Sequence, residues 1–261
     1  MKGVFRRFGK GRSRWTPAIF TSLLAFSIMA FQPPTTSWAK PRIGLNTGTD
    51  APYTTPDRKG FLDLIVADLF QELGYQGEIN RYVGASARAL QNSNSGHDDG
   101  EALRIGGLEK RFANLLPIPE SILDNDFVAY SLAGKDPIKT WEDLTPHMVS
   151  YLIGWQIFAK NINPGQNVVT VRGAGQLFEL LKLNRVDYSL YERWQGLYQA
   201  RKSQISVIVH EPPLASVKMF MYLHKKHAAL VSKAARLLSQ MKKDGRYQRI
   251  IDQTLTPLAR N

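Results

Sequence analysis

Hydrophobic positions in residues 40–261 follow two spacings, one typical of strands and one typical of helices. Short apolar or β-branched runs predict strands at residues 42–45, 79–83, 102–105, 149–153, 168–171, 188–190 and 205–209. Apolar positions that recur every three or four residues predict helices at residues 60–73, 176–183 and 228–243, with shorter helices at 86–91 and 155–161. Strands that alternate with helices in this way indicate an α/β fold, a mostly parallel sheet covered by helices.

The first 39 residues have the pattern of an export signal. Residues 1–15 are basic, residues 16–31 form an apolar run, and the small residues Ser37 and Ala39 stand at positions −3 and −1 before Lys40. The alternative is a permanent membrane anchor, but sixteen residues are fewer than the ~20 that span a bilayer. We therefore expect a cleaved signal peptide, a mature chain that begins at or near Lys40, and a periplasmic location.

Composition narrows the function classes. The 261 residues include 34 basic and 22 acidic side chains, a formal net charge of +12, and no cysteine. Without cysteine, disulfides, thiolate metal sites and cysteine nucleophiles are excluded. The export signal holds six of the basic residues and no acid, so residues 40–261 carry 28 − 22 = +6, a moderate charge that is not concentrated in one run. A surface that binds nucleic acid or an anionic polymer is a third-ranked hypothesis, and we expect no nucleic-acid partner.

Four segments follow one another in a recognisable order over residues 42–252. A strand leads into the loop Asp50-Ala51-Pro52-Tyr53 and a helix that opens with Gly60-Phe61, and Asp99 then precedes Arg111 by twelve residues. Residues 177–192 read LFELLKLNRVDYSLYE, and residues 233–252 read KAARLLSQMKKDGRYQRIID. In this order the segments resemble family 3 of the extracytoplasmic solute-binding proteins, the two-lobed periplasmic receptors best known from amino-acid uptake.

The resemblance implies a two-lobed, periplasmic-binding-protein-like α/β fold. Two hinge-crossing strands are expected near residues 127–131 and 216–222. Lobe one would comprise residues 40–130 and 218–261, and lobe two residues 131–217. In such proteins the ligand binds between lobes that close on a hinge.

The same resemblance implies a receptor and not an enzyme. The ligand would be small, anionic or zwitterionic and amino-acid-like, captured for transport or sensing by a monomer that needs no cofactor, with an inner-membrane ABC permease as candidate partner. The alternative is an enzyme on the same fold, because a few relatives are dehydratases. No hydrolase, metalloprotease, phosphate-loop or dinucleotide motif occurs. His97-Asp98-Asp99 with Glu101 could ligate a metal, but a solvated turn explains this cluster better, and we expect no metal.

Two arginines are candidates for holding an anionic group. Arg111 stands where the family has its ligand-clamping arginine, although a solvated cation beside Glu109 and Lys110 is the alternative. Arg104 lies within the apolar run 102–105 near the carboxyl end of a predicted strand, and the carboxyl end of a strand in an α/β lobe faces the crevice where ligands bind. Its alternative is an ion pair with Glu101 or Asp99. A guanidinium suits this role because its fork of donors matches a carboxylate.

Four further residues complete the candidate site. Glu192 stands five residues after Asp187, where amino-acid-binding members of the family place an acid against the ligand's ammonium group; the alternative is an ordinary acid at a helix start. Tyr53 and Trp155 could stack on a ligand or belong to the core. Asp50 could contact the ligand or shape a turn.

Overall fold

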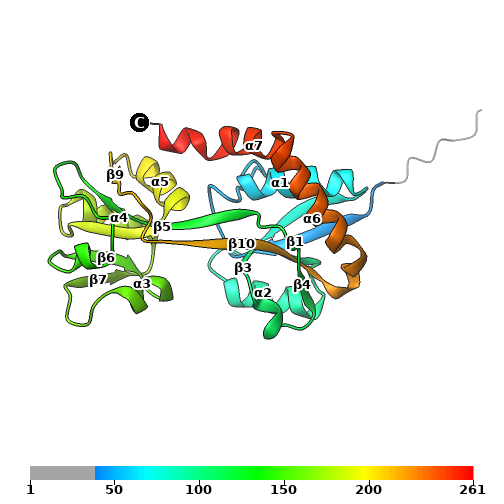
Figure 1. Cartoon of the computed structure of the whole chain (residues 1–261), viewed down its shortest axis with the longest axis horizontal. Coiled ribbons are helices and arrows are strands. Elements are labelled where there is room, and N and C mark those ends of the chain that lie inside the picture. Colours follow the sequence, from blue (N-terminus) through cyan, green and yellow to red (C-terminus); the bar gives the residue numbers. More distant parts are fainter. Residues whose placement is uncertain (1–38, 261) are drawn as a thin grey trace, which may run out of the picture. The chain divides into compact units, whose positions relative to one another are not determined.

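The computed structural model describes residues 39–260 (Figure 1). The predicted export signal, residues 1–39, lies outside this range except for Ala39. Within the described residues no helix combines the length and the apolar character that a membrane crossing needs.

One hydrogen-bonded sheet of ten strands runs through the described residues, in the order β2-β1-β3-β10-β5-β8-β6-β7, with β4 paired to β10 and β9 to β5. The strands are β1 Arg42–Thr47, β2 Gln76–Arg81, β3 Gly100–Ile105, β4 Leu115–Pro117, β5 Leu123–Ser131, β6 Val149–Leu152, β7 Val168–Val171, β8 Tyr188–Glu192, β9 Ile208–Val209 and β10 Ala215–His224. β1 pairs in parallel with β2 and β3, and β6 pairs in parallel with β7 and β8.

Two long antiparallel strands join these two parallel groups. β10 pairs with β3 and β4 through its second half and with β5 through its first half, whereas β5 pairs with β8 and β9 beyond residue 126. Figure 1 shows β5 and β10 side by side between two bodies, as their pairing requires. The α/β fold with two crossing strands is therefore confirmed, and the strand expected at residues 205–209 is reduced to β9.

The helices are α1 Phe61–Glu72, α2 Ser86–Ser95, α3 Gln156–Asn161, α4 Ala174–Lys182, α5 Arg193–Lys202, α6 Ala228–Lys243 and α7 Arg246–Thr254. One core cluster joins β1–β3 with α1 and α6, and we call this body lobe one. Two further clusters join β6, β8 and the C-terminal half of β5 with α3, α4 and α5. We call this second body lobe two. The residue boundaries given above for the lobes stay a prediction.

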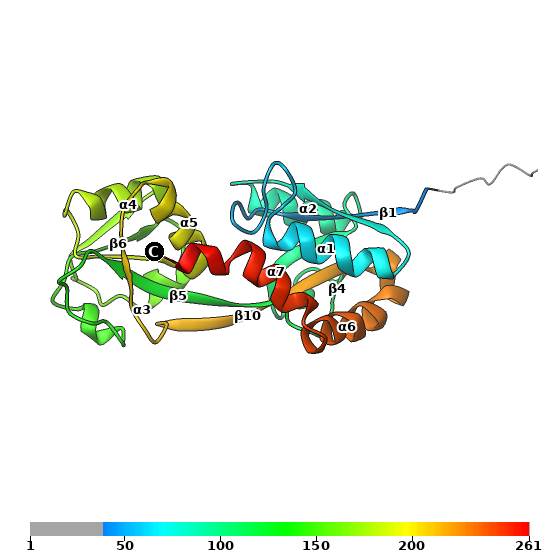
Figure 2. The ribbon, with the colours of Figure 1, turned by 90° about the horizontal axis from the view of Figure 1, so that it is seen from above.

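The C-terminal segment forms another link between the lobes. α7 follows α6 and packs on α1, and the 3-10 turn Thr256–Ala259 after it contacts α5 of lobe two. The Arg201 guanidinium on α5 donates to the carbonyl oxygens of Pro257 and Arg260 at 2.7 and 2.8 Å. Figure 2 shows α7 pointing from α1 towards α5, in agreement with the contacts of this segment to both lobes.

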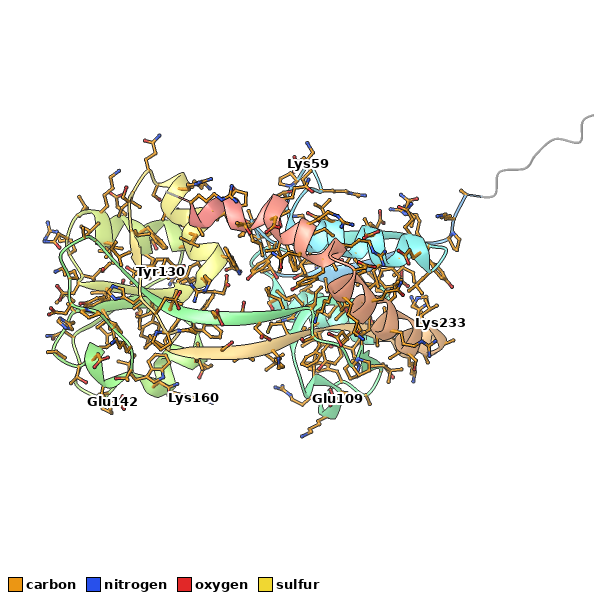
Figure 3. All side chains as sticks on the ribbon, turned by 45° about the horizontal axis from the view of Figure 1, so that its top comes forward. Lys59, Glu109, Tyr130, Glu142, Lys160 and Lys233 are labelled. Carbon is orange, nitrogen blue, oxygen red and sulfur yellow. The ribbon has the colours of Figure 1, made fainter. Side chains whose placement is uncertain are left out.

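The packing of α5 on β5 in lobe two depends on a close approach at Gly196. This glycine lies in α5 directly over the buried Tyr130 ring, which Figure 3 labels in lobe two. A Cβ at Gly196 would stand 2.3 Å from the Tyr130 hydroxyl. The hydroxyl itself donates to the carbonyl of Arg193 at 2.5 Å, so a shift of the ring away from a new Cβ would break this hydrogen bond.

We expect Gly196→Ala to destabilise the protein by about 1–3 kcal/mol, the usual cost of overpacking a core. The matched control is Gly175→Ala in α4, where the nearest atom to the new Cβ is Gln199 Nε2 at 3.6 Å. Alanine in that open helical position should be neutral or stabilising by up to ~1 kcal/mol. Urea unfolding of both variants measures the difference, and equal midpoints would refute the packing argument.

Candidate functional site

A cavity of about 590 Å³ lies between the lobes. Its walls come from the carboxyl ends of β1, β3, β6, β7 and β8 and the turns that follow them, the edge at which open α/β sheets bind ligands. The volume is in the range of small-molecule sites. Lobe one contributes Thr47, Gly48, Thr49, Asp50, Val83, Gly84, Ser86, Leu103 and Arg104, and lobe two contributes Leu152, Trp155, Arg172, Gly173, Ala174, Gly175, Tyr191, Gln195 and Gln199.

Arg104 lines the cavity and forms the ion pair that was its alternative role. Its Nε donates to Glu101 at 2.7 Å, and its two terminal nitrogens donate to the Ser86 hydroxyl at 2.6 Å and the Ser86 carbonyl at 2.9 Å. Glu101 is fully buried, and burial raises the pKa of its carboxyl while the Arg104 guanidinium opposes that rise. Arg104 is thus held rigidly at the cavity wall with most of its donors occupied.

Arg111 does not reach this cavity. It follows the 3-10 helix Leu108–Lys110, is exposed, and lays its guanidinium 5.7 Å from the centre of the Phe112 ring. Figure 3 shows Glu109 of the same short helix projecting from the edge of lobe one. The expected pair of arginines from lobe one is therefore not assembled in this structure: Arg104 lines the cavity and Arg111 is the solvated cation.

Asp50 and Trp155 both line the cavity, and their contact with a ligand stays a prediction. The Asp50 carboxylate is already paired, because Arg81 donates to it at 2.6 Å. The half-buried Trp155 ring stacks on Phe158 and leans on Tyr191, with ring centroids 5.8 and 4.7 Å apart. Trp155 therefore belongs to a packed aromatic group and also forms part of the cavity surface.

Tyr53 and Glu192 lie behind the cavity wall and contact each other. Both are fully buried, and neither lines the cavity. The Tyr53 hydroxyl donates to Glu192 Oε1 at 2.8 Å, while the backbone N–H groups of Trp194 and Gln195 donate to the same carboxylate at 3.1 and 2.9 Å. Glu192 is thus the N-cap of α5, which is the helix-start role that the sequence left open.

Sequence analysis missed Arg172 and the start of α4. Arg172 is exposed, and its guanidinium makes no hydrogen bond or ion pair within residues 39–260. The next residue, Gly173, is an N-cap without a side-chain acceptor, so the N–H groups of Ala174 and Gly175 have no cap at the cavity, while Gln176 N–H donates to the Gly173 carbonyl at 3.1 Å. A strand followed directly by Arg-Gly-Ala-Gly and an amphipathic helix was the signal that could have found this feature.

The acidic cluster at residues 97–101 is structural. Asp98 is buried and accepts from the side-chain amides of Asn46 and Asn80 at 2.8 and 2.6 Å, which corrects its assignment to a solvated turn. Asp99 pairs with Lys226 and His227. Within the described part of the chain, no three acidic or histidine side chains meet in an arrangement that could hold a metal ion.

Comparison with known proteins identifies the fold. No protein-family model and no curated sequence matches the chain. Among solved structures, it is similar to a probable amino-acid ABC transporter extracellular-binding protein of Bacillus subtilis, with 19% identity over 83% of this chain and 99% of the other and a TM-score of 0.69. A histidine kinase sensor domain similar to periplasmic binding proteins shares 17% identity over 83% and 96%, with a TM-score of 0.64.

An ancestral amino-acid-binding protein, a precursor of cyclohexadienyl dehydratase, shares 18% identity over 82% of this chain and 94% of its own, with a TM-score of 0.62. At these identities the likeness defines the fold, which is the bilobal fold of periplasmic binding proteins. It confirms the architecture that the four sequence segments indicated.

Burial of Glu192 generates a pH dependence of stability. Burial raises the pKa of this carboxyl from 4.5 to about 7, although hydrogen bonds from Gln195, Trp194 and Tyr53 oppose the rise. The folded state therefore binds a proton more tightly than the unfolded state. The resulting stability is fully present below pH 4.5 and is lost as the pH rises through about 7.

We expect the free energy of unfolding of the wild type, minus that of Glu192→Gln, to fall between pH 4.5 and 7 and to stay level above pH 7. At about 1.4 kcal/mol per pKa unit, the total change is on the order of 3 kcal/mol. Other titrating groups, including the nearby Asp126, are present in both proteins, so the difference isolates Glu192. Denaturant titrations across this pH range measure it, and a difference independent of pH would contradict the assignment.

Proposed function

We propose that this protein is a solute-binding protein that captures a small molecule with an anionic group in the cavity between its lobes. The observation that carries the proposal is the unpaired Arg172 guanidinium beside the uncapped start of α4. Both features attract an anion, the first by its full charge and bidentate donors and the second by oriented N–H groups. Arg104 stands at the same cavity from lobe one, so an anion there would meet cations of both lobes.

The structural neighbours support capture for transport or for sensing. One is a probable binding protein of an amino-acid ABC transporter, and another is the sensor domain of a histidine kinase. We propose that this protein acts in the periplasm after its signal peptide is removed, as a receptor that delivers its ligand to a membrane partner. An inner-membrane ABC permease is the partner that the transporter relative suggests.

The position of the acids supports binding over turnover. The dehydratase precursor among the neighbours keeps an enzyme as the alternative. An eliminating enzyme needs a proton-transferring group within hydrogen-bond reach of its substrate. Glu192, the carboxyl whose pKa lies near neutrality, is buried behind the cavity wall and caps a helix, so we base the proposal on binding.

A thermal-shift screen of metabolites identifies the ligand. At 100 times its dissociation constant, a ligand that binds the native state stabilises it by roughly 2.7 kcal/mol. With that ligand, we expect Arg172→Ala to weaken binding about 10- to 150-fold, the equivalent of the ~1.5–3 kcal/mol of a hydrogen bond to a charged group.

The matched control is Arg185→Ala, which removes another exposed guanidinium, one that does not line the cavity. Isothermal titration calorimetry of wild type and both variants gives the dissociation constants. Equal affinities in all three proteins would show that the anion does not bind at Arg172.

Ligand binding should also draw the lobes together. The cavity lies between bodies joined by β5 and β10, and a ligand that touches both favours the closed arrangement over the open one. Small-angle X-ray scattering should show a smaller radius of gyration at saturating ligand than without it. An unchanged radius under conditions where calorimetry shows full occupancy would rule out closure.

A further inference from the structure

The carboxylates around the cavity are all occupied by partners within the protein. Asp50 is the acid that lines the cavity among the described residues, and Arg81 holds it at 2.6 Å. Glu101 lies behind Arg104 and is bound to that guanidinium at 2.7 Å. An ammonium group entering the cavity would meet two carboxylates whose charge a neighbouring guanidinium already balances.

Glu192 is closed to a ligand for a different reason. It is 0% exposed, and three donors occupy its two oxygens: the Tyr53 hydroxyl, Trp194 N–H and Gln195 N–H. To reach an ammonium group it would have to break the N-cap of α5 and part from Tyr53. Loss of the N-cap alone would destabilise the start of α5.

The remaining charge at the cavity is positive. Of the two guanidiniums that line the cavity, that of Arg104 is paired with Glu101, whereas that of Arg172 has no acidic partner within residues 39–260. This unpaired positive charge can bind one carboxylate. The rest of the polar wall is neutral, formed by the side chains of Thr47, Thr49, Ser86, Gln195 and Gln199.

We propose that the ligand is a small monocarboxylate without an ammonium group, such as a 2-oxo or 2-hydroxy acid, and not a zwitterionic amino acid. This inference rests on the proposed function and names the substrate class of the same cavity. The carboxylate pairs with Arg172 at the start of α4, the hydroxyl and amide side chains bind the neutral oxygen, and Trp155 contacts the apolar part. The ammonium of an amino acid would lose water there without gaining an anionic partner, which is unfavourable.

Matched pairs of compounds test the inference. Alanine, leucine and phenylalanine are each compared with the 2-oxo and 2-hydroxy acids of the same skeleton, by calorimetry and by competition on the purified protein. We expect the amine-free member of each binding pair to bind at least about tenfold more tightly, a factor equal to ~1.4 kcal/mol. An amino acid that binds as tightly as its amine-free counterpart, or more tightly, overturns the inference and leaves the solute-binding function intact.

Glu192→Gln provides the second readout. If the carboxylate is closed to ligands, this variant keeps the wild-type ratio of affinities for amino and amine-free acids. A selective loss of amino-acid affinity in Glu192→Gln would show that Glu192 reads an ammonium, and the inference would then be wrong. If no amine-free carboxylate binds while a metabolite of another class gives a saturable shift, the substrate class is wrong and the receptor function stands.

Discussion

A buried carboxylate needs partners for both of its oxygens, and the way in which Glu192 meets this requirement organises the centre of the molecule. Two backbone N–H groups at the start of α5 donate hydrogen bonds to the carboxylate, and the Tyr53 hydroxyl donates a third. Because Tyr53 precedes α1 in lobe one and Glu192 ends β8 in lobe two, this bond joins the lobes beside the crossing strands. It also fixes the start of α5, from which Gln195 faces the cavity.

The acids around the cavity, like Glu192, are bound by partners within the protein. Each acid near the cavity has a cation or a helix start of the protein as its partner before a ligand arrives. The ion pairs differ in their contribution to stability. The Arg104–Glu101 pair is shielded from water and holds its geometry. In the Arg81–Asp50 pair the Asp50 side chain is 58% exposed, so this pair stabilises the protein less. Arg172 stands outside this pairing, and the proposed preference for an anionic ligand rests on its charge.

The sequence was sufficient to place a residue at the cavity where its position follows from the end of a strand, although ligand binding by these residues stays a prediction. Asp50, Arg104 and Trp155 all reach the cavity, because the carboxyl ends of parallel strands share one edge of a lobe. It failed where a contact joins distant segments. Tyr53 and Glu192 are 139 positions apart, and spacing along the chain does not reveal that each satisfies the other. Arg172 was overlooked because an arginine before glycine resembles any solvated cation until the helix start behind it is placed.

The likeness to amino-acid-binding proteins therefore determines less about the ligand than about the scaffold. Identities of 17–19% over nearly the whole length of the relatives preserve the lobes, the crossing strands and the edge where ligands bind. Ligand charge depends on a few side chains at that edge and on whether the protein has already satisfied them. At Glu192, the N–H groups of Trp194 and Gln195 make the acid a helix cap and the Tyr53 hydroxyl completes its hydrogen bonding, and none of these bonds alters the fold.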